Sequence, residues 1–222
     1  MSYHLVSKDR TRGLSKVKIC GITNLDDALL ALELGADELG FNFYTESQRY
    51  ISPKATRKII DVLPPNVFKV GVFVNEPIES ILKTAELAVL DAIQLHGDES
   101  YEYVRDLHSR TSVEIIKAIR IKPDFDWSEA MDFDAHAILF DSFSKDEYGG
   151  SGKRFDWKIA ADAIMMIPYL YLAGGLTAEN VAEAIRVVKP YAVDVASGVE
   201  LSPGKKDPIK VAAFIKAAKE AL

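Results

Sequence analysis

The chain has 222 residues with 48% hydrophobic content, a length that suits one α/β-barrel domain. Its 27 Lys and Arg residues against 33 Asp and Glu residues give a net charge of −6 without a basic block, which argues against a nucleic-acid partner. No apolar stretch approaches the roughly 18 residues of a membrane helix, and the first residues lack an apolar signal core, so we expect a cytoplasmic protein without a membrane partner. The single cysteine, Cys20, excludes intrachain disulfides and any metal site built from several thiolates.

A polar segment at residues 1–15 is expected to be an N-terminal extension, and residues 16–222 are expected to form a single domain. In that domain, short β-branched runs alternate with longer segments of helical periodicity, which is typical of a parallel sheet built from βα units. The runs are nearly continuous in apolar residues, as expected of strands buried on both faces. Eight strands are predicted, at residues 17–22, 38–43, 68–74, 92–95, 114–119, 137–141, 169–173 and 192–196.

The segments between the strands carry signals for the ends of helices. Asn24 can cap the free amides of the helix that follows it, and Gly35 can end that helix. Proline at the first helical position is favoured because its fixed φ is helical and its missing N–H is not needed there. Further helix starts are predicted at Ser52-Pro53, Thr177 and Asp207-Pro208.

Eight βα units can form either a closed barrel or an open doubly wound sheet. The open sheet normally begins with a Gly-rich fingerprint that this sequence lacks, so the prediction is a (β/α)8 TIM barrel. Active sites of such barrels lie at the C-terminal ends of the strands. The one long irregular segment, residues 142–155, is expected to be functional because loops of that length are uncommon in compact domains.

Cys20 closes the first strand, where a thiol would reach the catalytic end of the barrel. It is either a small core residue or a base or nucleophile. Lys18, if it lies nearby, would lower the pKa of the thiol toward neutrality, whereas the alternative is a buried packing or salt-bridge role. Asp141 closes the sixth strand after four apolar residues and is either a loop cap or a proton donor, since burial favours the neutral carboxyl group.

Other candidates for substrate binding follow from the same rule. Arg49 lies in the loop after the second strand and could grip a carboxylate, although a solvated surface arginine is the alternative. His96 closes the fourth strand and would contact the substrate or pair with Asp98. The four histidines lack metal-ligand spacing, so no metal is expected. Glycines that suit backbone binding of a phosphate end the seventh and eighth strands: Gly174, Gly175 and Gly198.

Several long motifs stand in the same order along residues 16–219, at the positions that the barrel prediction assigns to the strand ends. They are VKICGITNLDDALLALELGAD, GFNFY with QRYISP, VGVFVN, QLHGDE, LFDS with EYGGSGKRFDW, LAGGLTAENV and VDVASGVE with PGKKD. Together they closely resemble the phosphoribosylanthranilate isomerase family of tryptophan biosynthesis. The resemblance implies a cofactor-free Amadori rearrangement of N-(5'-phosphoribosyl)anthranilate to 1-(2-carboxyphenylamino)-1-deoxyribulose 5-phosphate.

The resemblance also implies roles for individual residues. Cys20 would be the general base that removes the proton from C2 of the sugar, and Asp141 the general acid that protonates the ring oxygen. Arg49 would hold the anthranilate carboxylate. Apart from the resemblance, their places near the strand ends make Lys18 and His96 further candidates for substrate contact. The phosphate loops would include Gly174, Gly175, Ser197 and Gly198. The alternatives are another phosphosugar-processing barrel enzyme and a non-catalytic barrel that binds phosphorylated metabolites, and the chain is expected to act as a monomer or a homodimer.

Overall fold

The computed structural model describes residues 15–122, 125–142 and 156–221. The predicted extension at residues 1–15 therefore lies outside the described residues, except for Ser15, whose hydroxyl donates to the carbonyl of Pro190. The predicted functional loop at residues 142–155 lies outside them as well, except for Ser142.

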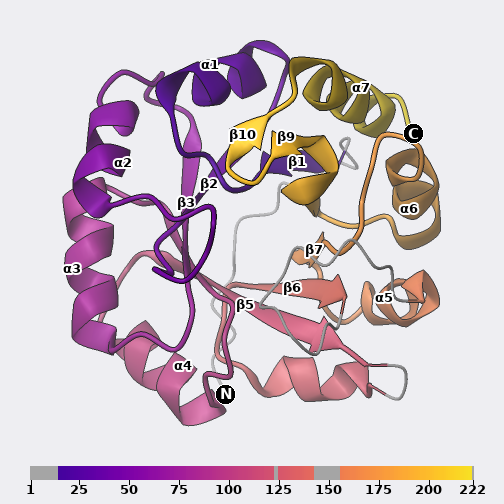
Figure 1. The fold of residues 1–222 in the computed structure, drawn as a ribbon. Coiled ribbons are helices and arrows are strands. Elements are labelled where there is room, and N and C mark those ends of the chain that lie inside the picture. The colour runs from indigo at the N-terminus through magenta and orange to yellow at the C-terminus, as the bar shows by residue number, and fades with distance from the viewer. Residues whose placement is uncertain (1–14, 123–124, 143–155, 222) are drawn as a thin grey trace.

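Eight parallel strands close into a barrel in the order of the sequence, and a ring of helices surrounds it (Figure 1). Closure is made by β1, which pairs with β2 on one side and with β8 on the other, where Lys16 lies opposite Ala192. The predicted TIM barrel and its eight strands are confirmed, with strand ends displaced by at most three residues. The strands are β1 Lys16–Ile19, β2 Glu38–Asn42, β3 Phe68–Phe73, β4 Ala92–Leu95, β5 Glu114–Ile121, β6 Ala137–Ser142, β7 Leu170–Leu172 and β8 Ala192–Val195.

The crossovers are α-helical with one exception. Between β5 and β6 the described residues form a 3₁₀ helix, η1 Trp127–Asp132, instead of an α-helix. A six-residue 3₁₀ helix is longer than most, since runs beyond three or four residues are uncommon. The α-helices are α1 Leu25–Glu33, α2 Pro53–Ile60, α3 Ile78–Ala88, α4 Tyr101–Ser109, α5 Trp157–Ala163, α6 Val181–Val188 and α7 Pro208–Lys219.

Most predicted helix ends are confirmed by their hydrogen bonds. The side chains of Asn24, Ser52 and Asp207 each accept a backbone N–H in the first turn of α1, α2 and α7, and Gly35 follows α1 with a φ of 101°. The predicted start at Thr177 is wrong, because α6 begins four residues later.

Residues 177–180 form a turn of their own before that helix. The Asn180 side chain accepts the N–H of Thr177 and donates to the carbonyl of Gly175, and its backbone N–H also bonds to Thr177. These bonds compete with the helical pattern, as asparagine side chains often do.

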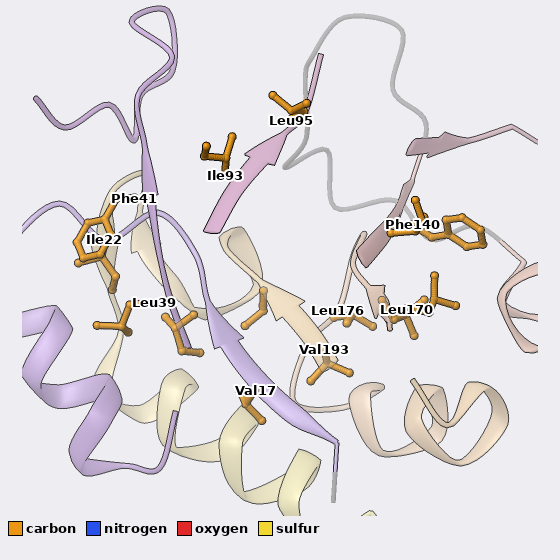
Figure 2. Packing of buried hydrophobic residues seen from close by; sticks show 14 of the residues in the cluster. Val17, Ile22, Leu39, Phe41, Ile93, Leu95, Phe140, Leu170, Leu176 and Val193 are labelled. Carbon is orange, nitrogen blue, oxygen red and sulfur yellow. The ribbon is translucent and has the colours of Figure 1, made fainter. Parts of the chain in front are cut away.

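Two hydrophobic clusters lie on opposite faces of the sheet. Successive side chains of a strand alternate between these faces, so on β1 Val17 and Ile19 pack against the helices while Lys18 points into the barrel. Figure 2 shows members of the outer cluster around β1 and β2, including Val17 and Leu39. The inner cluster is smaller and fills the barrel with Val70, Ala92, Ile116, Ala118, Ala137, Leu139, Tyr171, Ala173 and Ala192.

After β8 the chain makes a short excursion that the sequence patterns did not predict. The 3₁₀ turn η2 Ser197–Val199 leads into two short antiparallel strands, β9 Glu200–Ser202 and β10 Lys205–Lys206, which lie beside β1 in Figure 1. Strands of three and two residues are too short to show an alternating pattern. This excursion brings Glu200 and Lys206 next to the end of β1.

Candidate active site

A cavity of about 480 Å³ opens where the strands end. Its size falls in the range typical of small-molecule sites. Every strand except β5 contributes lining residues, either from the strand itself or from the segment that follows it. The predicted site residues that line it are Cys20, Arg49, His96, Asp141, Gly174, Gly175, Ser197 and Gly198.

Cys20 follows β1 directly and is partly exposed to the cavity. Its N–H donates to the carbonyl of Val195 over 2.8 Å, which fixes the backbone beneath the thiol. A glycine in β2 makes room for the sulfur, because a Cβ atom at Gly40 would lie 2.7 Å from Sγ. Burial raises the pKa of the Cys20 thiol, although the charges of Lys18 and Lys206 oppose this effect. The predicted net lowering by Lys18 is therefore wrong, because desolvation outweighs its charge.

Lys18 is fully buried and does not line the cavity. Its Nζ donates to Oδ1 of Asp194 over 2.9 Å and to Oε1 of Gln94 over 3.0 Å. Burial favours the neutral amine, but the Asp194 carboxylate and other charges outweigh it, and the pKa of Lys18 is raised. The structure thus places Lys18 in the salt-bridge role that the sequence left open, not in contact with the substrate space.

Asp141 lies at the end of β6 with only 4% of its surface exposed. Its Oδ1 accepts the backbone N–H of Ser142 over 2.7 Å, and its Oδ2 lies 3.2 Å from Nε2 of His96. The other ring nitrogen of His96 lies 2.9 Å from Nε2 of Gln94. The alternative pairing of His96 with Asp98 is wrong, because the Asp98 carboxylate is exposed and forms an ion pair with Arg120.

Arg49 extends over the cavity from the loop after β2 and is held by a carboxylate from the other side of β1. Its Nε and Nη2 donate to the carboxylate of Glu200 over 2.9 and 2.7 Å. Gly21 provides the space for the arginine, since a Cβ atom there would lie 2.7 Å from Cδ of Arg49. The fork is therefore oriented before any ligand arrives.

Lys206 links this pair to the cysteine. Its Nζ donates to Oε1 of Glu200 over 3.0 Å and to the carbonyl of Cys20 over 2.5 Å. Burial lowers the pKa of Lys206, and the charge of Glu200 offsets this only in part. Burial would raise the pKa of Glu200, but the hydrogen bond from Arg49 and the charge of Lys206 outweigh it and lower that pKa.

Bare backbone forms the part of the cavity that follows β7 and β8. Gly174 and Gly175 both have positive φ, 87° and 63°, which disfavours side chains there. A Cβ atom at Gly198 would overlap the carbonyl oxygen of Leu176, so only glycine fits where these two segments touch. Ser197 and Gly198 begin the 3₁₀ turn η2; the first N–H groups of such a turn have no partner within it and are suited to an anion.

The sequence analysis did not identify four polar residues of this site: Gln94, Asp194, Glu200 and Lys206. Gln94 and Asp194 carried a signal, because polar residues within apolar strands need a partner inside the barrel. Glu200 and Lys206 carried no secondary-structure signal, since their elements are too short to recognise, although both stand in the motif VDVASGVE with PGKKD. Within the described ranges, no group of three or more His, Cys, Asp or Glu side chains could hold a metal ion. In that same part of the chain, no helix is long and apolar enough to cross a membrane.

A family model described as N-(5'-phosphoribosyl)anthranilate isomerase matches residues 17–217. The chain belongs to this family. The Thermotoga maritima isomerase is 51% identical over 204 residues, which cover 92% of this chain and 98% of the relative. The Trichlorobacter lovleyi isomerase is 50% identical over 207 residues, which cover 93% and 99%. The resemblance found in the motifs is thus confirmed over the whole barrel.

Solved isomerase structures agree with the fold as well. A crystal structure of the Thermotoga maritima isomerase superimposes with a TM-score of 0.85 at 48% identity and covers 93% of this chain and 99% of that one. Another isomerase structure, with a TM-score of 0.82 and 47% identity, contains reduced 1-(o-carboxyphenylamino)-1-deoxyribulose 5-phosphate. Its chain is covered to 99% and this one to 93%.

Proposed function

We propose that Cys20 and Asp141 are the base and the acid with which this isomerase converts N-(5'-phosphoribosyl)anthranilate into 1-(2-carboxyphenylamino)-1-deoxyribulose 5-phosphate. The observation that carries the proposal is that both side chains line one cavity, together with a forked arginine and two glycine-rich turns. The substrate has a matching set of groups: a carboxylate, a phosphate and a sugar between them. No metal or cofactor takes part in the proposed reaction.

Asp141 acts first in this scheme. Its carboxyl proton passes to the furanose ring oxygen, and the bond between C1 and that oxygen breaks as the nitrogen lone pair forms a C=N bond. The product of this step is an open-chain protonated Schiff base, and Asp141 becomes a carboxylate. The position of Asp141 at the end of β6 supports the role, because its carboxyl group lines the same cavity as Cys20.

Cys20 acts second. Its thiolate removes the proton from C2, the electrons of the C–H bond form a C1=C2 double bond, and the nitrogen regains its lone pair. The resulting enolamine becomes the aminoketose by moving the proton of the C2 hydroxyl to C1. A proton then passes from the Cys20 thiol to the Asp141 carboxylate through solvent, which restores the enzyme. The electron-poor Schiff base makes C2–H more acidic, so a thiolate is a sufficient base for this step.

The two ends of the substrate are proposed to bind to different parts of the cavity. Arg49, already held by Glu200, contacts the anthranilate carboxylate. The phosphate binds to backbone N–H groups after β7 and β8, where four residues contribute: Gly174, Gly175, Ser197 and Gly198. Backbone amides of adjacent βα loops are the usual phosphate site of these barrels. His96 is proposed to face the sugar beside Asp141.

For the wider organisation we propose what the sequence predicts. Residues 16–222 are proposed to be the catalytic barrel, with residues 1–15 as an extension to it. We propose a cytoplasmic enzyme that is a monomer or a homodimer; the Thermotoga maritima relative is a dimeric isomerase. Analytical ultracentrifugation of the full chain distinguishes the two states.

The roles are tested by following the fluorescence of freshly generated N-(5'-phosphoribosyl)anthranilate with wild type, Cys20→Ala and Asp141→Asn. Each variant is expected to lose about 10²–10⁴-fold in kcat while keeping its fold, because each removes one proton-transfer group. Asp162→Asn is the matched control, since it removes an exposed carboxylate on α5 that does not line the cavity. Near-normal turnover in either folded site variant would refute the assignment of that residue.

A further inference from the structure

A continuous chain of hydrogen bonds crosses the inside of the barrel from the first strand to the sixth. Nζ of Lys18 contacts Oε1 of Gln94 over 3.0 Å, and Nε2 of Gln94 contacts Nδ1 of His96 over 2.9 Å. The other nitrogen of His96, Nε2, contacts Oδ2 of Asp141 over 3.2 Å. All four side chains are at least nine-tenths buried, so water competes little with these bonds.

The chemistry of Lys18 fixes the direction of every bond in the chain. An ammonium group can only donate, so the atom of Gln94 that faces it must be the carbonyl oxygen. The amide nitrogen of Gln94 then points at Nδ1 of His96, and because it can only donate, Nδ1 must accept. An imidazole whose Nδ1 accepts carries its proton on Nε2, the atom that faces Asp141.

We propose that Gln94 is a positioning residue that holds His96 in its neutral Nε2–H tautomer, so that His96 donates a hydrogen bond to Asp141. The proposal rests on the role of Asp141 as the general acid. It assigns Lys18 the task of anchoring the Gln94 amide, with Asp194 as the counter-ion of the lysine.

Both alternatives to this arrangement are unfavourable. A proton on Nδ1 of His96 would face the amide hydrogens of Gln94, donor against donor. Rotation of the amide would relieve that contact but would turn its hydrogens toward the ammonium of Lys18. Two donors that face each other without an acceptor are costly in a buried network. The orientation of the Gln94 amide and the tautomer of His96 are therefore well determined.

The tautomer matters for the first chemical step. As Asp141 gives its proton to the ring oxygen, negative charge develops on its carboxyl group. The Nε2–H bond then stabilises the carboxylate that remains, and bonds to the charged form of a group are the stronger ones. His96 thus stabilises the form of Asp141 that follows proton transfer.

Nitrogen-15 NMR of the full-length protein with labelled histidine tests the tautomer directly. The chain has four histidines, and His96→Asn identifies the signals of His96 by their loss. The expected result for wild type is a protonated Nε2 and an unprotonated Nδ1 near neutral pH. A protonated Nδ1, alone or in an imidazolium ion, would overturn the proposal. The wild-type spectrum gives this result without any substitution at Gln94.

Gln94→Glu tests the positioning role. A carboxylate there accepts from both neighbours, so Nδ1 of His96 becomes a donor and its NMR signal shifts accordingly. We expect kcat to fall by about 10–100-fold, as for other partners that orient a functional imidazole, with KM within about threefold. Gln48→Glu is the control, because it adds the same charge at an exposed position of the cavity rim. It is expected to leave the His96 signals unchanged.

The outcomes separate this proposal from the one on which it rests. An unchanged tautomer and an unchanged kcat in Gln94→Glu would refute the positioning role while leaving Asp141 as the acid. Full turnover in Asp141→Asn would refute the role of Asp141 as the general acid. It would also remove the catalytic role of the hydrogen bond from His96. The pattern that supports both is an inactive Asp141→Asn, an Nε2–H wild type and a tautomer change with reduced kcat in Gln94→Glu.

Discussion

A methyl group added at Gly40 should displace the Cys20 thiol. Its effect on catalysis can be measured separately from its effect on the stability of the fold. A Cβ atom there would lie 2.7 Å from Sγ of Cys20 and 3.0 Å from its Cα. Non-bonded heavy atoms pack best at about 3.5–4.0 Å, so in Gly40→Ala the sulfur must move by about 1 Å. A displacement of this size costs about 10²-fold in rate when it misplaces a reacting group.

The matched control is Gly71→Ala in the neighbouring strand β3. Its added methyl would overlap Leu90 and would lie 2.9 Å from Phe43, so it overpacks the outer face of the barrel and not the site. Both variants are expected to lose about 1–3 kcal/mol in the free energy of unfolding. Only Gly40→Ala should lose kcat.

Two assays decide between these effects. Urea denaturation gives the loss of stability in each variant, and turnover below the unfolding transition gives kcat per folded molecule. Equal kcat in both variants would refute the reasoning, whether both keep it or both lose it. Such a result would mean either that the thiol adapts freely to the methyl group or that the rate depends on packing in general.

Three further predictions concern the charges and the last helix. Glu200→Gln weakens the paired hydrogen bonds that hold the Arg49 guanidinium. KM should therefore rise by roughly tenfold with a smaller change in kcat, measured by steady-state kinetics. Lys206→Met removes a positive charge that lowers the pKa of Cys20, so the pKa of Cys20 should rise further. Alkylation of Cys20, the only cysteine of the sequence, should therefore slow at neutral pH and recover at higher pH. An alkylation rate with the pH dependence of wild type would contradict this direction. Asp207→Ala removes the N-cap of α7 and should cost about 1 kcal/mol in urea denaturation, while Asp207→Asn should cost less.

Local signals in the sequence predicted the barrel and most of its site. Alternation of apolar runs with helical periodicity defined all eight strands, and caps such as Asn24 acted through contacts only a few residues away. The rule that barrels work at their strand ends then placed Cys20 and Asp141 at the cavity. The start predicted at Thr177 failed because the Asn180 side chain accepts the N–H of Thr177 in a local turn that competes with the helix, which the apolar pattern does not show.

The pairing of charges inside the barrel was decided only by the tertiary structure. Lys18 meets Gln94 and Asp194, which lie 76 and 176 residues away along the chain, and Arg49 meets Glu200 at a separation of 151 residues. Periodicity tells which face of a strand a residue occupies, but not which residue stands across the barrel from it. That depends on the register of eight strands and on closure of the sheet, so the burial that raises the pKa of Cys20 could not be read from its sequence neighbour Lys18.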